Sequence, residues 1–78
     1  MERYFFDLRN GTVERDVTGT ELPGLADARR EAIRFLGEVL KDEPERLAEG
    51  TLHVDVSDDR QRHLFGLRVL LDDVWPSP

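Results

Sequence analysis

Cysteine is absent from this sequence of 78 residues. A disulfide framework, thiolate chemistry and a cysteine-ligated zinc site are therefore excluded. Long apolar runs are absent as well, since only Tyr4, Phe5 and Phe6 stand together before Asp7, too few for the core of a signal peptide. No other run approaches the length of a membrane span. We therefore expect a cytoplasmic protein that folds in a reducing compartment and contacts no membrane.

Positive charge is in the minority: 17 acidic residues stand against 11 basic ones, and the formal net charge is −6. An acidic surface repels the phosphate backbone of nucleic acids, so we expect no nucleic-acid partner. Charges of both signs alternate along the chain and 38% of the residues are hydrophobic, which favours a folded chain over a disordered one. At this length we expect a single domain over residues 1–78, with a C-terminal tail over residues 72–78.

Two strands are predicted near the N-terminus. Residues 3–9 alternate between two faces, as expected for a strand. Asn10-Gly11 follows directly and is typical of a tight hairpin, because both turn positions need a positive φ. The second strand is expected to return over residues 12–15. One face of the first strand carries Tyr4, Phe6 and Leu8, and the other carries Arg3, Phe5, Asp7 and Arg9.

A helix is predicted from the residue after Gly24, which serves as its N-cap, to Lys41. Residues 16–20 indicate a loop before it. Pro44 makes the residue before it a poor helical position, and we expect one further turn over residues 44–49. Apolar residues at steps of three and four form the face that packs on the sheet: Leu25, Ala28, Ala32, Leu36 and Val39, widened by Phe35 and Leu40.

Two more strands are predicted after the helix, because apolar and polar residues alternate over residues 52–56 and again over residues 63–69. The resulting fold class is α+β: a four-stranded antiparallel sheet in the order β-β-α-β-β, with one main helix packed on one face. The expected register of the last two strands places Val54 opposite Phe65 and Leu52 opposite Leu67, with their side chains on the covered face.

His53, Asp55 and His63 are the candidates for a metal site or a general-base pair. His53 and Asp55 share a strand face, and His63 completes the group only if it lies opposite Asp55. That register turns the apolar residues of the last strand away from the core, where each buried large side chain contributes about 1.5–3 kcal/mol. We therefore predict that His63 points toward the core edge and His53 toward solvent, and we assign no metal ligand.

Motifs for catalysis and for cofactors are missing: the sequence contains no GxGxxG, no GxxxxGK[ST] and no GxSxG. We predict no catalytic residue and no cofactor. Three pairs of neighbouring acids are expected to cap turns or to face solvent, since sequence neighbours seldom share one site. These pairs are Asp42-Glu43, Asp58-Asp59 and Asp72-Asp73.

Phe5, Leu64 and Trp75 are the candidate interaction residues. Phe5 and Leu64 are expected on the sheet face that the helix leaves open, and such a face or an unpaired edge strand often serves self-association. Trp75 either anchors a partner or folds back onto the core with the tail. A strip of aromatic residues that stacks on RNA bases is disfavoured around Phe5, because alternation buries its neighbours and Asp7 opposes phosphate.

The segments RYFFDLRNG, at residues 3–11, and DVTGTELP, at residues 16–23, resemble a family of short bacterial proteins of unknown function. Its usual pattern is RYFFHLRDG, then D-x-x-G-x-E-L-P-D-L and an alanine-rich helix, and the resemblance covers nearly the whole chain. Asp7 stands where that family often has histidine, and Gly24 where it often has aspartate. The resemblance implies a fold and a bacterial origin, and it transfers no functional residue.

A weaker likeness, over residues 19–25 and 27–32, is to HicB-type antitoxins, without their DNA-binding segment. It implies a protein that neutralises a small toxin through a sheet surface. Three functions therefore stay open. The first is a non-enzymatic interaction or regulatory module that self-associates through the open sheet face, an edge strand or the tail at Trp75. The second is an antitoxin-like partner of a small toxin, and the third is a small metal-dependent enzyme using His53, Asp55 and His63.

Overall fold

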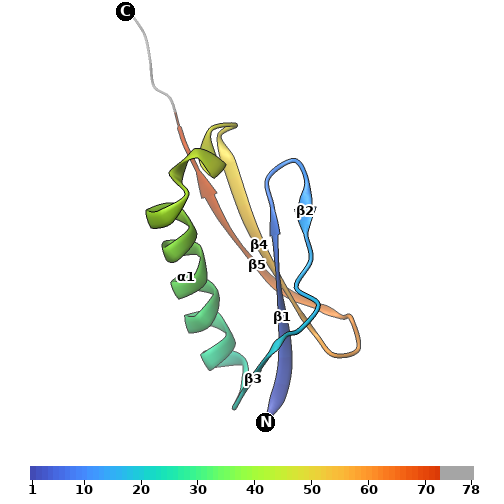
Figure 1. Cartoon of the computed structure of the whole chain (residues 1–78). Coiled ribbons are helices and arrows are strands. Elements are labelled where there is room, and N and C mark those ends of the chain that lie inside the picture. Colours follow the sequence, from blue (N-terminus) through green and yellow to red (C-terminus); the bar gives the residue numbers. More distant parts are fainter. Residues whose placement is uncertain (73–78) are drawn as a thin grey trace, which may run out of the picture.

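A computed structural model describes residues 1–72 and places one long helix across one face of an antiparallel sheet (Figure 1). The α+β fold class is therefore confirmed. The sheet has the strand order β2-β1-β4-β5, and β3 pairs with β1 on the same side as β2. Along the chain the elements are β1 (Glu2–Arg9), β2 (Val13–Glu14), β3 (Thr20–Leu22), α1 (Leu25–Asp42), the 3-10 turn η1 (Pro44–Leu47), β4 (Thr51–Asp58) and β5 (His63–Leu70).

The core lies between α1 and the sheet face that carries the even-numbered residues of β1 and β4. Leu52, Val54 and Val56 of β4 are completely buried, because β4 is an inner strand with β1 and β5 on its two sides. Val56 lies opposite Phe6 of β1, so two large apolar side chains meet under the helix. The remaining buried apolar residues are Tyr4, Leu8, Ala28, Ala32, Leu36 and Val39.

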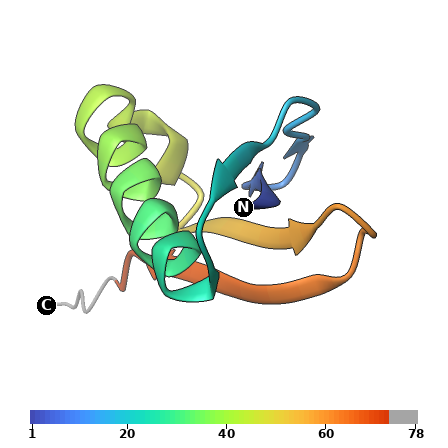
Figure 2. The ribbon, with the colours of Figure 1, turned by 90° about the horizontal axis from the view of Figure 1, so that it is seen from below.

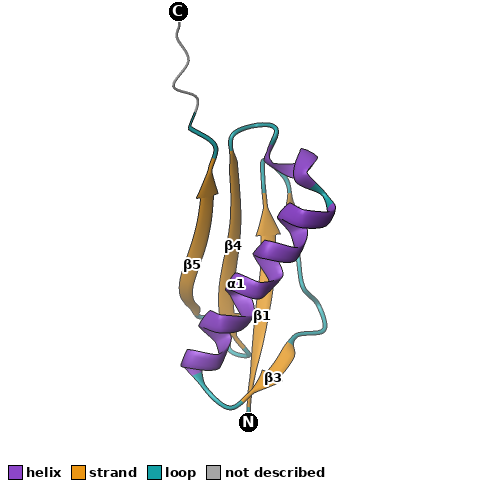
Figure 3. Ribbon diagram, turned by 90° about the vertical axis from the view of Figure 1, so that its left-hand side faces the viewer, coloured by secondary structure: helices purple, strands orange, loops and turns teal. Residues whose placement is uncertain are grey.

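Helix α1 begins and ends where the sequence predicts. Gly24 is its N-cap, and the backbone N–H of Glu43 still bonds Val39 before Pro44 stops the helix. Two buried alanines, Ala28 and Ala32, let the helix approach the sheet closely. Figure 3 shows α1 crossing the sheet diagonally, from the side of β5 at its start to the side of β1 at its end. The expected burial of Leu25 is wrong: it is 43% exposed, because it precedes the first turn that packs on the sheet.

The register of the β4–β5 hairpin differs from the predicted one by two residues. Val54 lies opposite Leu67 and Leu52 opposite Val69, in place of Phe65 and Leu67. The predicted face is nevertheless correct, because a shift of two residues keeps every side chain on its own side of the sheet. A β-bulge interrupts the ladder between Val56 and Ser57, at the start of β5.

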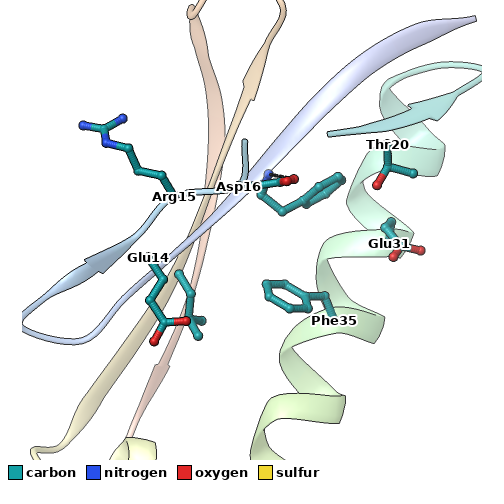
Figure 4. Close-up of a pocket in the computed structure, with 8 residues that line it drawn as sticks. Glu14, Arg15, Asp16, Thr20, Glu31 and Phe35 are labelled. Atoms are coloured by element: carbon teal, nitrogen blue, oxygen red, sulfur yellow. Dashed lines mark hydrogen bonds between the residues drawn. The ribbon is translucent and has the colours of Figure 1, made fainter. Parts of the chain in front are cut away.

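The segment predicted as a loop over residues 16–20 contains the start of an additional strand, β3, which pairs with the first residues of β1. Asp16 fills the gap between β2 and β3. Its Oδ2 accepts the backbone N–H of Phe6 at 3.1 Å, a contact drawn in Figure 4, and its Oδ1 accepts the backbone N–H groups of Thr18 and Gly19 at 3.1 and 2.9 Å. One carboxylate therefore takes the place of a neighbouring strand along this edge of β1.

The first hairpin is looser than predicted. Arg9 pairs with Val13, which leaves three residues in the turn instead of two and shortens the second strand to Val13–Glu14. Gly11 takes the positive φ of the turn, at 104°. The amide of Asn10 donates to the backbone oxygen of Arg46 at 3.1 Å, which ties the hairpin to η1.

Replacing Gly19 should destabilise the fold. Its φ is +77°, and a Cβ there would lie 2.9 Å from side-chain carbons of both Arg3 and Phe5. We expect Gly19→Ala to lower the free energy of unfolding by about 1–3 kcal/mol, measured by urea denaturation. The control is Gly37→Ala, whose Cβ meets nothing within 4 Å and which should add about 0.5–1 kcal/mol within the helix. Equal effects of the two substitutions would contradict this account of the segment.

Candidate functional site

An ion pair joins β1 and β4 on the sheet face that α1 does not cover. Arg9 Nε donates to Asp55 Oδ2 at 2.9 Å, and the Nη2 atom lies 3.4 Å from Oδ1. The same Nη2 is 3.2 Å from Nδ1 of His53. Arg9 lies directly opposite His53 in the ladder, so its guanidinium reaches diagonally to the next outward residue of β4.

His63 joins this group, contrary to the expectation that it points toward the core edge. The bulge at the start of β5 pairs His63 with Ser57, on the open face, while Phe65 stays opposite Val56 on the covered face. Nε2 of His63 lies 3.8 Å from Oδ1 of Asp55. The one residue inserted by the bulge thus allows His63 to lie near Asp55 while the apolar residues of β5 stay on the covered face. In the sequence analysis these two placements were treated as mutually exclusive.

The three candidate ligands nevertheless do not converge on a common point. Asp55 is engaged by the guanidinium of Arg9, which also contacts His53. Within residues 1–72, no three His, Cys, Asp or Glu side chains are grouped so that they could hold a metal ion. In this arrangement the guanidinium of Arg9 lies between the carboxylate of Asp55 and the imidazole of His53. The positive charge of Arg9 balances the negative charge of Asp55.

Hydrogen bonds from neighbouring donors favour the ionised form of two carboxylates of β4, Asp55 and Asp58. The hydrogen bond from Arg9 is the main reason that the pKa of Asp55 is lowered. At the far end of β4, Asp58 accepts the backbone N–H groups of Arg62 and Arg60, both at 2.9 Å, and the side chain of Arg62 at 2.8 Å. The backbone hydrogen bond from Arg62 contributes most to lowering the pKa of Asp58. Both shifts move away from neutral pH, where a general acid must titrate.

A hollow of about 420 Å³ lies on the open face beside this group, and its wall is mainly acidic. Phe5 and Val17 supply its apolar part, and the ring of Phe5 leans against Gly19. A second hollow, of about 320 Å³, lies between α1 and the β2–β3 segment, where Figure 4 shows Phe35 and Glu31 of the helix facing the strands. The charged residues around the first hollow are Asp7, Arg15, Asp16, Asp55, Asp58, Asp59 and His63.

The three predicted interaction residues differ in how exposed they are, and one of them lies outside the described part of the chain. Phe5 is half-buried on the open face, and Leu64 is 38% exposed beside the bulge. Trp75 lies outside the described residues. Sequence reasoning missed Ile33 and Leu70, which are 61% and 58% exposed. The signal for Ile33 was available, since it is a large apolar residue outside the helix stripe.

The fold and the paired charges define a small domain of one sheet and one helix. A comparison with protein families shows which family this domain belongs to. Residues 3–70 match the domain of unknown function DUF6894, and the chain belongs to this family. The resemblance found in the RYFF and D-x-x-G segments is thereby confirmed. No curated protein and no solved structure matches the chain. Over residues 1–72, no helix combines the length and apolar character needed to cross a membrane.

The Arg9–Asp55 contact should make the free energy of unfolding depend on pH. Because the pKa of Asp55 is lower in the folded chain than in the unfolded one, its ionisation stabilises the fold. This contribution is complete above the ordinary carboxyl pKa of about 3.9 and is lost as the pH falls through the lowered value. We expect Asp55→Asn to lower the free energy of unfolding at pH 7 and to differ less from the parent at pH 3. Denaturant titrations at both pH values measure this, and a difference independent of pH would contradict it.

Proposed function

We propose that this chain is a non-enzymatic, cytoplasmic protein-interaction module that self-associates through the outer edge of β5. The observation that carries the proposal is the state of that strand. In the described part of the chain, β5 pairs with β4 on one side and with no strand on the other. An edge of eight residues exposes backbone N–H and C=O groups that another strand can bind.

Edge strands of monomeric proteins usually carry features that prevent such pairing. Proline, lysine, inward-pointing charges and bulges are the common ones. β5 contains neither proline nor lysine, and Arg68 is the one charged residue within its regular ladder from Phe65 to Leu70, since its bulge lies at the first residues. The other margin of the sheet is covered by β2, β3 and the carboxylate of Asp16. Figure 2 shows β5 and β3 at opposite margins of the sheet.

Part of the surface around β5 is apolar, although Arg29 also lines it. A groove of about 270 Å³ runs between α1 and this strand, and Ile33, Phe65 and Leu67 line it. At the end of the strand, Leu70 projects from the open face of the sheet and Leu71 follows it, at 58% and 53% exposure. A second strand added at this edge would bury these side chains as well as form backbone hydrogen bonds, so both terms favour association.

The non-enzymatic part of the proposal is supported by the ion pairs of Asp55 and Asp58. A general acid or base needs a pKa near neutral pH, whereas Arg9 and Arg62 lower the pKa values of Asp55 and Asp58. Their carboxylates serve to hold neighbouring strands and a turn. The cytoplasmic location is supported by the absence of cysteine from the whole sequence.

A second candidate, the antitoxin-like one, is favoured by the acidic hollow on the open face. Its carboxylates would attract a small basic protein, and such binding weakens steeply as salt is added. Self-association through β5 rests on apolar contacts and backbone hydrogen bonds, and it should persist at high salt. The salt dependence of whatever complex forms therefore separates the two candidates.

Sedimentation equilibrium tests the first candidate. We expect a dimer that dissociates on dilution, and we expect Leu70→Glu to raise its dissociation constant by about tenfold or more. The folded subunit should keep its stability to within about 0.5 kcal/mol, because the substituted side chain is on the surface. Val17→Glu is the matched control. Val17 is 86% exposed and lies near the opposite margin of the sheet from β5, in the segment between β2 and β3. A parent chain that remains monomeric at high concentration would rule out self-association.

A further inference from the structure

The centre of β5 carries a glycine at a position where an added Cβ would make ordinary contacts. Gly66 lies opposite Asp55, and a Cβ there would be 3.4 Å from Oδ1 of that carboxylate and 3.9 Å from Nε2 of His63. Glycine weakens a strand interior, and in such positions it often marks the close approach of another chain or ligand. Because Gly66 has no side chain, the cross-strand neighbour of Asp55 on β5 does not cover its carboxylate, and the Asp55 side chain keeps 28% exposure.

Arg68 is the cation on the same strand and the same face, two residues further on. It is exposed, and among residues 1–72 it forms no salt bridge. The surface at β5 therefore carries two opposite charges. The carboxylate of Asp55 lies next to Gly66, and the guanidinium of Arg68 lies two residues further along the strand. A surface with both charges, offset along one strand, is complementary to a second copy of itself.

We propose that two copies of this chain pair their β5 strands antiparallel about a two-fold axis at Leu67, so that Arg68 of each copy lies across Gly66 of the partner subunit and binds the partner's Asp55. This inference rests on the proposed self-association and specifies its register. The pairing is isologous, so each contact is formed twice.

The register follows from three constraints. The two-residue alternation must continue across the junction, which requires a two-fold axis at a residue rather than between residues. An axis at Arg68 places two arginines opposite each other. An axis at Gly66 draws both bulged positions, His63 and Leu64, into the ladder, whereas an axis at Leu67 draws in only Leu64 and pairs Phe65 with Val69 inside the regular stretch.

The axis at Leu67 also joins the apolar surfaces. Leu64 of each copy then lies opposite Leu70 of the partner subunit on the open face, and the grooves beside Ile33 meet on the covered face. The distance from β5 of one copy to β4 of the other is two strand spacings, about 10 Å. An arginine and an aspartate together span this distance when no side chain stands between them, which is the condition that Gly66 provides.

A double-mutant cycle on the dissociation constant of the dimer tests the ion pair. We expect Arg68→Ala to raise the constant about tenfold, because the contact occurs twice. In an Asp55→Asn background the same substitution should change it less than about twofold. Arg15→Ala is the matched control, since Arg15 is 78% exposed at the far margin of the sheet, and it should leave the constant unchanged. Independent, additive effects would overturn the ion pair.

Single cysteines test the register, since the parent sequence has none. Under mild oxidation Leu67→Cys should form a disulfide-linked dimer, because each residue on the axis faces its own copy. Val69→Cys, which should face Phe65 of the partner subunit, should not cross-link to itself. A parent chain that stays monomeric would overturn the proposed function and this inference together. A dimer in which Gly66→Cys cross-links and Leu67→Cys does not would overturn the register alone and leave the function standing.

Discussion

The structure depends on the covering of one sheet face by one helix. The apolar side chains of β1 and β4 project to that face and meet the buried alanines and leucine of α1. Because α1 does not cover the other face, and the segment around Val17 and Gly19 overlies only part of it, the polar residues there must be hydrated or paired. Arg9 and Asp55 satisfy this requirement by pairing with each other across two strands. The same asymmetry leaves the two margins of the sheet as the remaining places where backbone groups need partners.

Alternation in the sequence predicts the face of each strand residue, whereas the register needs information that alternation does not contain. The predicted pairing of Val54 with Phe65 and the observed pairing with Leu67 place the same side chains in the core. Only the turn and the bulge distinguish the two arrangements. The position of His63 depends on that bulge, so its approach to Asp55 could not be predicted from a two-residue period.

The segment over residues 16–20 illustrates a second limit. A run of small and polar residues indicates a loop, and part of it is one. Yet Asp16 accepts three backbone N–H groups, from Phe6, Thr18 and Gly19, and thereby joins a short strand to β1. A side-chain carboxylate that accepts the backbone N–H groups two and three residues later is the mark of an Asx turn. The D-x-x-G spacing carried this local signal, but the bond to Phe6 spans ten residues and has no sequence signature.

The two margins of the sheet differ in how their backbone hydrogen-bonding groups are satisfied, and this difference bears on the proposed function. Along β1, a carboxylate and two short strands satisfy the exposed backbone. Along β5, a regular edge carries Gly66 at its centre, at a cost of about 0.5–1 kcal/mol relative to alanine. A Cβ at this position would lie 3.4 Å from Oδ1 of Asp55 and 3.6 Å from the backbone oxygen of Val54, at the lower limit of ordinary contact. In the dimer that we propose, Arg68 of the second copy would use the space beside Gly66 and would offset this cost.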